Sequence, residues 1–409
     1  MRRIALALLI LFIFTIPWEY SLVLPAPFGN VARMAGLLAL AAAIPAVLHT
    51  GHLRTPAVLH WLVLAFYLWW CCTCFWTIDT TATLTRLRGD FQEMMIVWLL
   101  WEFTEDAVGL LAVLRAWVAG TGVLALLTLA DFAWASAIGA YQVRFVAAGQ
   151  DPNDVARFID LGLPIAALLF RCEQRAVVRW AALALLPACL TAVLLTASRG
   201  GFLAAAVALA GCAIILGRGQ AKTFAAGILA LPAVLAGIWL VIPSGTLDRL
   251  ATIPAELARG DLNQRINIWQ AGWTAFVHSP ILGTGAGTFV NAAHTSEIDT
   301  AHNTLLSIAV SGGLCAVFLA AAVVVAVVRL LPELHGLLRI ALSTVLAVCA
   351  LSSLVATVEE SRTTWLLLGV VAVSARLASK RTHELETCFE PACSIEGNAA
   401  GATVIPAPQ

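Results

Sequence analysis

The stretch NTLLSIAVSGGLCAVFLAAAVVVAVV, residues 303–328, decides the class of this fold. It contains no charged residue, and it exceeds the roughly 20 apolar residues that an α-helix needs to cross a bilayer. Similar runs precede and follow it along the chain. They cover residues 4–16, 32–48, 57–76, 91–103, 113–130, 158–170, 180–196, 200–217, 223–243, 340–356 and 364–377. The pattern predicts an all-α, polytopic membrane protein with about twelve transmembrane helices.

The composition of the whole chain agrees with this class. Of the 409 residues, 61% are hydrophobic and 12% are charged, whereas a soluble domain has about 45–50% and 25%. These figures exclude a soluble globule, a disordered chain, collagen and a disulfide scaffold. The 24 basic and 24 acidic residues balance, which argues against nucleic acid as a partner. The long unbroken apolar runs also argue against a β-barrel, whose strands alternate.

The N-terminus and the cysteines add two expectations. Met1-Arg2-Arg3 and the apolar run after it resemble a signal peptide, but no small-x-small cleavage site follows, so a signal anchor is predicted. Most of the ten cysteines lie inside apolar runs, where they are expected to be small core residues. Cys388 and Cys393 lie in a polar tail without histidines at zinc spacing, so no metal site is expected there.

Basic residues set the predicted orientation. With a cytoplasmic N-terminus, both lysines, Lys222 and Lys380, fall in cytoplasmic loops. Arginine alone occupies the opposite, periplasmic side, at Arg33, Arg86, Arg88, Arg144, Arg157, Arg199, Arg249, Arg259, Arg265 and Arg362. Because basic residues are disfavoured there, we expect some to bind phosphate, whose oxygens suit the planar guanidinium. Snorkelling and surface pairing are the alternative, favoured for Arg33, Arg249 and Arg259.

One predicted periplasmic loop is long, about residues 244–301. It contains a short amphipathic run, 247–257, and a second helical run that ends at Pro280. The apolar stripe of the second run consists of Ile266, Trp269, Trp273, Phe276 and Val277. A glycine-rich turn, 283–287, follows; its spacing does not fit a nucleotide fingerprint. Residues 1–378 are predicted to form the membrane domain, and 379–409 a cytoplasmic, disordered tail.

Two short motifs are candidates for structure or for chemistry. Asp151-Pro152-Asn153 is typical of a capped turn that begins a helix. Ser198-Arg199-Gly200-Gly201 joins two apolar runs with almost no loop, which requires glycine. It places Arg199 near the membrane surface, where a charge is costly unless it is paired or faces water. We therefore expect Arg199 to hold an anionic ligand, with a buried ion pair as the alternative.

Further candidates flank the long loop. Arg265 precedes Trp269 by four residues and shares its helix face, either for a cation–π contact or to reach a phosphate above it. His302-Asn303 begins the tenth apolar run. The unperturbed pKa of histidine, about 6.5, suits a general base. Three charged residues crowd the last external loop, to pair with arginines or to position an acceptor: Glu359, Glu360 and Arg362.

These motifs occur together and in a fixed order. They are Asp151-Pro152-Asn153-x-x-Ala156, Ser198-Arg199-Gly200, Arg265-x-x-x-Trp269 with Pro280-x-x-Gly283-x-Gly285, and His302-Asn303-x-x-Leu306 with Gly312-Gly313. As a set, over about residues 60–378, they resemble bacterial O-antigen ligases and O-antigen polymerases. The resemblance implies about twelve transmembrane helices and one large periplasmic loop between two late spans, which the hydropathy pattern predicts independently.

The resemblance implies a ligase of the bacterial inner membrane, with its active site facing the periplasm and both termini in the cytoplasm. It would transfer O-antigen from undecaprenyl pyrophosphate to a sugar hydroxyl of lipid A–core oligosaccharide, which completes lipopolysaccharide. The ligase pattern matches at His302, Asn303 and Gly313, but Ala316 occupies its last position, where Gly, Thr or Tyr is usual. An O-antigen polymerase and a protein O-oligosaccharyltransferase stay open. The latter usually carries an extra periplasmic C-terminal region.

For such a ligase, Arg199 and Arg265 are expected to bind the donor pyrophosphate, together with Arg86 and Arg88 from a short external loop. His302 is the expected general base for the acceptor hydroxyl, and direct attack would invert the anomeric centre. The sequence has no carboxylate pair like the Asp-rich metal sites of many glycosyltransferases, so neither metal nor cofactor is expected.

A transporter of anionic lipids is an alternative from a different class. It would place charges deep within several spans, along a path that reaches both faces. The apolar runs are nearly free of charge away from their ends, which favours a transferase with its chemistry on one face.

Overall fold

The computed structural model describes residues 1–25, 28–220, 225, 229, 232–233, 236–260, 265–295, 300–380 and 388–389. Its α-helices are α1 (Arg2–Thr15), α2 (Val31–Thr50), α3 (Val58–Cys72), α4 (Thr80–Phe103), α5 (Ala107–Ala137), α6 (Pro152–Cys172), α7 (Ala176–Leu195), α8 (Arg199–Gly217), α10 (Ser244–Ala251), α11 (Ile253–Arg259), α12 (Arg265–His278), α13 (Phe289–Ala293), α14 (Thr304–Val328), α15 (Gly336–Ser353) and α16 (Arg362–Lys380). The 3₁₀ helices are η1 (Ile16–Ser21), η2 (Thr73–Phe75) and η3 (Leu331–Glu333). The strands of the described part are β1 (Val23–Leu24) and β2 (Gly29–Asn30), an antiparallel pair.

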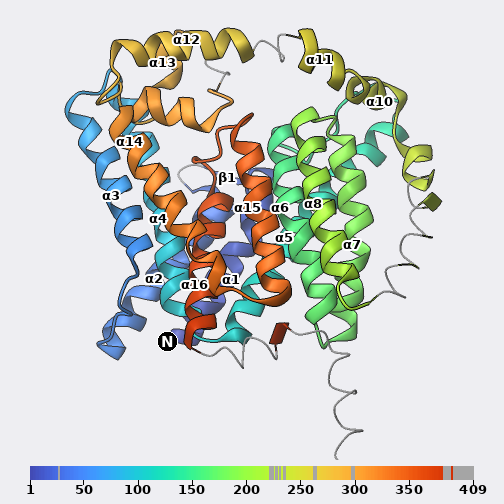
Figure 1. The fold of residues 1–409 in the computed structure, drawn as a ribbon, viewed down its shortest axis with the longest axis horizontal. Helices are drawn as coiled ribbons and strands as arrows, with labels where there is room; N and C mark the ends of the chain where they lie inside the picture. The colour runs from blue at the N-terminus through green and yellow to red at the C-terminus, as the bar shows by residue number, and fades with distance from the viewer. Residues whose placement is uncertain are drawn as a thin grey trace, which may run out of the picture.

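The long helices form a bundle, and α10, α11, α12 and α13 lie across one end of it (Figure 1). We call this end the loop end; the N-terminus lies at the opposite end. Helix α6 is buried over nearly its whole length and packs against α5, α7, α8 and α15. Helix α14 packs against α3, and α16 against α4. Of the loop-end helices, α10 packs against α8, and α12 and α13 pack against α14.

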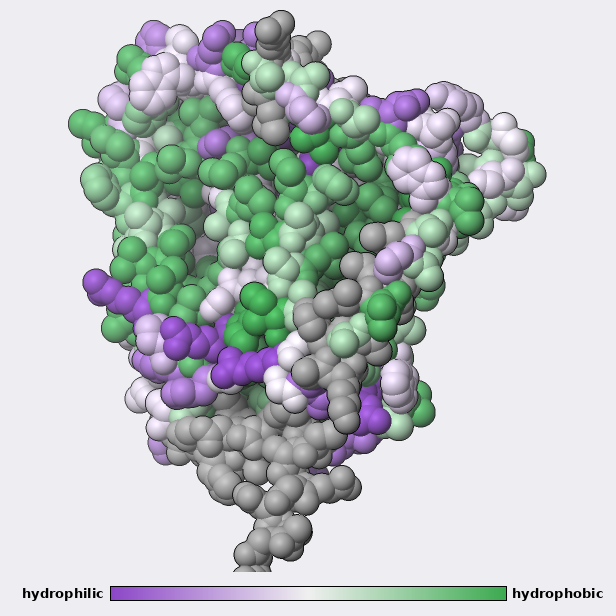
Figure 2. Space-filling view, turned by 45° about the vertical axis from the view of Figure 1, so that its right-hand side comes forward, coloured by the Kyte–Doolittle hydropathy of each residue, from purple (hydrophilic) through white to green (hydrophobic). Residues whose placement is uncertain are grey.

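The surface of the bundle is suited to a membrane. Eight helices of the described part are long and apolar enough to cross one. Figure 2 shows a broad hydrophobic belt around the middle of the visible face, with hydrophilic residues above and below it. These observations confirm an all-α, multi-pass membrane protein. Because α4 and α6 carry several charged side chains, the number of twelve spans stays a prediction. The orientation and the periplasmic loop also stay predictions. Part of the run 223–243 and most of the tail 379–409 lie outside the described residues.

Side-chain caps decide where several helices begin. Asp79 Oδ1 accepts a hydrogen bond of 2.9 Å from the Ala82 amide, which starts α4 eleven residues before the apolar run at 91. Arg86 and Arg88 therefore lie within a helix, and the prediction that they belong to a short external loop is wrong. Asp151 accepts from the amides of Asn153 and Asp154 and starts α6 at Pro152, as the sequence predicted.

Helix α12 forms where the periodicity predicted a helix, but with a different buried face. Its buried residues are Ile268, Gly272 and Ala275. Trp273 and Val277, members of the predicted stripe, are 61% and 55% exposed. The apolar stripe of the sequence is therefore not the buried face of α12. At a membrane surface, large apolar side chains are stable facing lipid, and the small residues let α12 approach the bundle.

Helix α14 is interrupted near its middle. Gly313 has φ of +66° and ψ of −169°, which releases the carbonyl groups before it from the helix. The glycine-rich turn supplies their partners: the amides of Thr284 and Gly285 donate to the carbonyls of Val310 and Ser311, at 2.9 and 2.8 Å. Trp69 Nε1 donates to the Gly312 carbonyl at 2.9 Å. A broken helix within a bilayer requires such compensation, so the glycine motifs build a rigid support for the start of α14.

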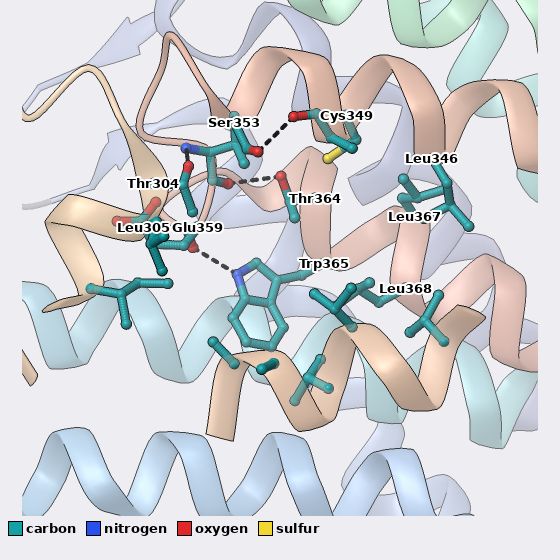
Figure 3. A pocket seen from close by; sticks show the side chains of 18 of the residues that line it. Thr304, Leu305, Leu346, Cys349, Ser353, Glu359, Thr364, Trp365, Leu367 and Leu368 are labelled. Carbon is teal, nitrogen blue, oxygen red and sulfur yellow. Dashed lines mark hydrogen bonds between the residues drawn. The ribbon is translucent and has the colours of Figure 1, made fainter. Parts of the chain in front are cut away.

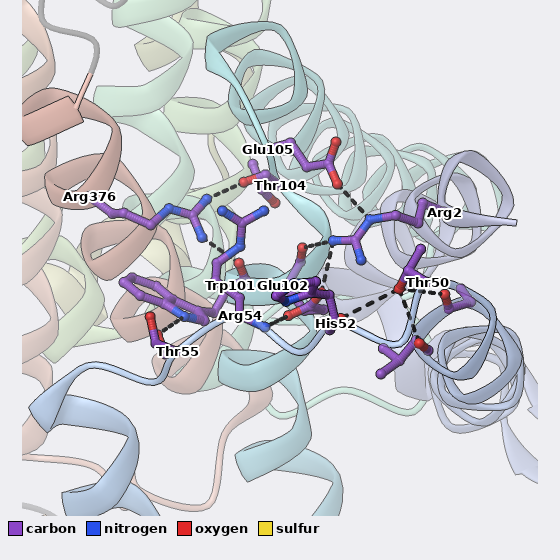
Figure 4. A network of polar contacts seen from close by, with 12 residues as sticks. Arg2, Thr50, His52, Arg54, Thr55, Trp101, Glu102, Thr104, Glu105 and Arg376 are labelled. Atoms are coloured by element: carbon purple, nitrogen blue, oxygen red, sulfur yellow. Dashed lines mark hydrogen bonds and ion pairs between the residues drawn. The ribbon is translucent and has the colours of Figure 1, made fainter.

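The end opposite the loop end is closed by polar contacts (Figure 4). Arg2 forms ion pairs of 2.8 Å with Glu102 and 2.6 Å with Glu105. Arg376 donates to the Trp101 carbonyl, and its guanidinium lies 4.6 Å from the centre of the Trp101 ring. These contacts join α1, α4 and α16.

Candidate functional site

Two motifs far apart in the sequence meet at the hairpin between α7 and α8. Ser198 caps α8: its Oγ accepts from the Gly201 amide at 3.1 Å and donates to Asn153 Oδ1 at 2.8 Å. A Cβ at Gly201 would lie 2.3 Å from the Ala156 Cβ, so only glycine allows this approach. The segment from Asn153 to Ala156 and the Ser198–Gly201 hairpin therefore form one packed unit.

Arg199 projects from this unit toward α10 and α11. Its Nη2 donates to Thr252 Oγ1 at 2.6 Å, and its Nη1 lies 3.1 Å from Glu256 Oε1. The side chain is 22% exposed. Arg199 is thus ion-paired and partly exposed to solvent. That it holds an anionic ligand stays a prediction.

Two further arginines contact the same hairpin. Arg144, in the segment between α5 and α6, donates from Nε to the Thr196 carbonyl at 3.0 Å. Arg249, in α10, donates from Nε to the Ala197 carbonyl at 3.2 Å. Neither forms an ion pair with a carboxylate among the residues that the structure describes. Three guanidinium groups, from Arg144, Arg199 and Arg249, therefore converge on one turn.

The proximity of these charges is reflected in the pKa values of the arginines. Burial and the guanidinium of Arg249 lower the pKa of Arg144 to about 10. Arg265 and Arg199 act in the same direction, while Asp151 opposes them. Burial also lowers the pKa of Arg265, which has no ion pair in the described part of the chain. A site with this excess of positive charge favours an anion. We call Arg144, Arg199, Arg249 and Arg265 the arginine cluster.

Helix α12 connects the arginine cluster to His302. Trp269, one helical turn after Arg265, donates from Nε1 to the Ala301 carbonyl at 3.1 Å. Because residues i and i+4 share a helix face, Arg265 lies on the side of α12 that holds the segment before α14. The indole of Trp269 thus acts as a structural anchor beside His302.

His302 occupies an unusual backbone position at this junction. Its φ is +46°, in the left-handed region that few non-glycine residues adopt. The side chain is half-buried, and its Nδ1 lies 3.4 Å from Thr300 Oγ1. Such strained positions cluster at functional sites.

Asn303 fixes the start of α14. Its Oδ1 accepts from the Leu306 amide at 2.9 Å and its Nδ2 donates to the Leu354 carbonyl at 3.2 Å. Thr304 Oγ1 donates to the Ala356 carbonyl and accepts from the Val358 amide, both at 2.9 Å. The segment between α15 and α16 therefore fixes Asn303 and Thr304, the two residues that follow His302.

Two apolar grooves meet at Asn303. One, of about 880 Å³, runs between α12 and α14 and is lined by Trp269, Trp273 and Leu306, among others. The other, of about 520 Å³, lies between α14, α15 and α16; Figure 3 shows Leu305, Leu346, Trp365 and Leu368 around it. Both grooves lead from the bundle surface toward the residues beside His302, which suits a substrate with a long hydrocarbon chain.

Arg86 belongs to a separate, acidic cluster. It lies 2.5 Å from Asp90, 3.6 Å from Glu93 and 3.3 Å from Glu360. Glu359 Oε2 is shielded from solvent and has no hydrogen-bond partner in the described part. Burial and the neighbouring Glu360 raise the pKa of Glu359 to about 8, although Ser307 and Arg86 oppose them. The carboxylates of Asp90, Glu93 and Glu360 therefore already balance the positive charge of Arg86.

The remaining predicted residues lie elsewhere. Arg88 is exposed on another face of α4 and lines an open pocket of about 330 Å³ with Arg33 and Tyr67. Arg362 forms an ion pair with Glu19 and donates to Gln92 Oε1 at 2.9 Å. Arg199 and Arg265 thus both lie near Arg144, and Trp269, one turn after Arg265, contacts the residue before His302. Arg86, Glu359 and Glu360 lie beside Ser307 and Ser311 of α14. Arg88 and Arg362 lie apart from this acidic cluster and from the arginine cluster.

Sequence reasoning did not select Arg144 for this site. The available signal was its place in the predicted periplasmic arginine set, seven residues before Asp151. The segment had no periodicity that would have indicated its direction.

Comparison with known proteins gives one family match. The family described as O-antigen ligase matches residues 181–321. The matched range contains Arg199, Arg265, Trp269 and His302. No curated protein matches the chain.

Proposed function

We propose that this chain is an O-antigen ligase, a proposal that the match of the O-antigen ligase family to residues 181–321 supports. It transfers O-antigen from undecaprenyl pyrophosphate to a sugar hydroxyl of lipid A–core oligosaccharide at the periplasmic face of the inner membrane. The observation that carries this proposal is the hydrogen bond from Trp269 to the Ala301 carbonyl. It supports a site in which His302 and Arg265, which has no ion pair among the described residues, share one membrane-surface face.

The donor diphosphate binds Arg199 and Arg265. As the bond between the anomeric carbon and the diphosphate oxygen breaks, the electron pair and the developing negative charge remain on the diphosphate. Charge-assisted hydrogen bonds from guanidinium groups stabilise that charge more strongly in the transition state than in the ground state. The hydrocarbon chain of the donor lies in one of the two apolar grooves beside Asn303.

The acceptor hydroxyl attacks from the face opposite the leaving diphosphate, so that the anomeric centre is inverted. A new bond forms between the hydroxyl oxygen and the anomeric carbon, and His302 takes the hydroxyl proton. A general base of this kind contributes about 10²–10⁴-fold to the rate. We propose that the reaction needs neither a metal ion nor a cofactor.

Reconstitution tests the proposal. Purified protein in vesicles would be given lipid-linked glycan and lipid A–core oligosaccharide, and the products separated on a gel. Glycan on lipid A–core is the expected result. Longer lipid-linked chains would identify a polymerase instead, and glycan on a protein acceptor an oligosaccharyltransferase. Movement of intact donor across the bilayer without transfer would support the transporter alternative.

Variants of the two predicted donor ligands test the site itself. Arg199→Ala and Arg265→Ala should each lower the transfer rate by about 10²–10³-fold, the range for removing a transition-state donor. Lysine at either position should restore little, because a point charge does not reproduce the guanidinium fork. Arg33→Ala, an exposed arginine at the start of α2, is the control and should retain activity. Activity near that of the wild type in both alanine variants would show that the two arginines are structural.

A further inference from the structure

Arg144 is held in place from two sides. The segment that carries it is fixed by the hydrogen bond of 2.9 Å from the Phe145 amide to the Leu195 carbonyl, and the Phe145 ring packs edge-on against Phe132. The Arg144 Nε donates to the Thr196 carbonyl at 3.0 Å. These contacts set the guanidinium directly beside the α7–α8 hairpin.

Asn153 determines how the guanidinium is turned. Its Oδ1 accepts from Arg144 Nη2 at 3.3 Å and from Ser198 Oγ at 2.8 Å. One amide oxygen therefore joins Arg144 to the turn that carries Arg199. The Arg144 Nη1 has no hydrogen-bond partner among the described residues, and Arg144 as a whole is half-buried. A preoriented donor is left available.

The charge balance leaves room for an anion. Of the arginine cluster, Arg199 is the member with an ion pair in the described part of the chain, to Glu256. Asp151 is the other described carboxylate that shifts a pKa in the cluster, and its Oδ1 accepts from backbone amides. Among the described residues, four guanidinium groups thus lie near two carboxylates that act on them. A diphosphate esterified at both ends carries two negative charges, which matches the surplus.

We propose that Arg144 is a third arginine ligand of the donor diphosphate, and that Asn153 is its positioning residue. This inference rests on the proposed function for the identity of the donor. When the glycosyl bond breaks, the diphosphate keeps the electron pair and gains a further negative charge at its free end. Arg144 adds a third guanidinium to hold this product, with Nη1 as the donor that the protein leaves unused.

Binding of inorganic pyrophosphate tests the inference without any transfer reaction. Full-length protein in detergent would be titrated by calorimetry. We expect Arg144→Gln to weaken the affinity at least about tenfold, the loss of one charge-assisted contact of about 1.4 kcal/mol or more. Arg33→Gln removes an exposed arginine at the same end and should bind as the wild type does. Equal binding by Arg144→Gln and wild type, or no binding by the wild type, would overturn the inference.

The positioning role of Asn153 has its own signature. Asn153→Ala should weaken pyrophosphate binding, but it should add little in the Arg144→Gln background, because both changes act through one guanidinium. A merely structural Asn153 would give additive losses. If Arg144→Gln fails to fold, the Arg144→Lys variant tests the assignment instead, because lysine keeps the positive charge but lacks the planar guanidinium group. Lysine that binds pyrophosphate as tightly as arginine would contradict the assignment.

The outcome separates this inference from the proposed function. Loss of pyrophosphate binding in Arg144→Gln, with no glycan transfer by the wild type, would support the site and refute the ligase. Transfer by the wild type, with unchanged binding and unchanged transfer by Arg144→Gln, would refute the role of Arg144 alone.

Discussion

His302 lies at a backbone position that costs free energy, with φ of +46°. The hydrogen bond from Trp269 to Ala301 on one side and the Asn303 cap on the other hold it there. A non-glycine residue in the left-handed region costs of the order of 1–3 kcal/mol and persists when its surroundings enforce it. The anchors therefore fix the imidazole in one place, as a base or a phosphate ligand would require.

The pH dependence of single-turnover transfer distinguishes two roles for His302. A general base must be neutral, so the rate should rise with pH as the imidazole loses its proton. An imidazolium that binds phosphate would give the opposite trend. We expect a rising rate when the donor is saturating. A falling rate over the range of roughly pH 6–8 would move His302 into the diphosphate site. His302→Ala should be inactive in both cases and serves to show that the profile belongs to this residue.

Glu359 makes a second prediction at the residue scale. Its pKa is raised from 4.5 to about 8, first by burial and then by Glu360. Between these two values the native state keeps a proton that the unfolded chain releases, so the free energy of unfolding falls as pH rises. Replacement by a neutral isostere removes this penalty. The melting temperature of Glu359→Gln should therefore fall less between pH 6 and pH 9 than that of the wild type.

The control for this measurement is Glu360→Gln. Glu360 is 40% exposed and pairs with Arg86, so this change removes an ion pair without relieving a buried carboxyl. It should not reduce the pH dependence in the same way. Identical pH dependence of Glu359→Gln and wild type would show that Glu359 is ionised at neutral pH.

At the scale of elements, the broken helix α14 and the glycine-rich turn form one hydrogen-bonded unit. The amides of residues 284 and 285 take the carbonyl groups that the break at Gly313 releases. The turn itself is bound to the α3–α4 connection, where the Ile78 amide donates to the Thr284 carbonyl at 3.0 Å. The first half of α14 is thus oriented independently of the second half, and His302 is placed by that orientation.

Gly313→Ala should disrupt this hydrogen-bonded unit. A Cβ at Gly313 would lie 2.1 Å from the Ile281 carbonyl oxygen, at a φ of +66° that alanine avoids. We expect a loss of several degrees in melting temperature together with loss of transfer. Gly89→Ala is the matched control: Gly89 lies within α4, no atom lies within 4 Å of its added Cβ, and alanine favours a helix by about 0.5–1 kcal/mol. Normal stability of Gly313→Ala would show that the break is not required.

At the scale of the whole molecule, the polar features divide between the two ends of the bundle. The arginine cluster, His302 and both grooves lie at the loop end or open toward it. The opposite end carries the ion pairs of Arg2 with Glu102 and Glu105. The lysine and arginine distribution predicts that the loop end faces the periplasm.

Cysteine labelling in intact cells tests this orientation. In a background without native cysteines, Asp248→Cys in α10 should react with a reagent that does not cross membranes. Gln174→Cys, between α6 and α7 at the other end, should react after the membrane is opened. Both positions are exposed, so access depends on the side of the membrane. Labelling of Gln174→Cys in intact cells would reverse the orientation.

The sequence alone determined the membrane class and the positions where α6, α8 and α14 begin. Long apolar runs allow no other class of fold, because their surface must be removed from water. The caps at Asp151, Ser198 and Asn303 are local, since each side chain bonds to an amide two or three residues ahead. For the same reason the existence of α12 was predictable from its periodicity.

The tertiary structure decided which charges are used and which are free. Whether a guanidinium meets a carboxylate depends on helices far apart in the sequence, as in the pairing of Arg86 with Glu360 and of Arg362 with Glu19. The buried face of α12 depends on which neighbour it meets. Arg144 belongs to the site because Asn153 and the α7–α8 hairpin hold it there. These ion pairs, the buried face of α12 and the position of Arg144 depend on packing between distant helices. The local sequence pattern therefore does not predict them.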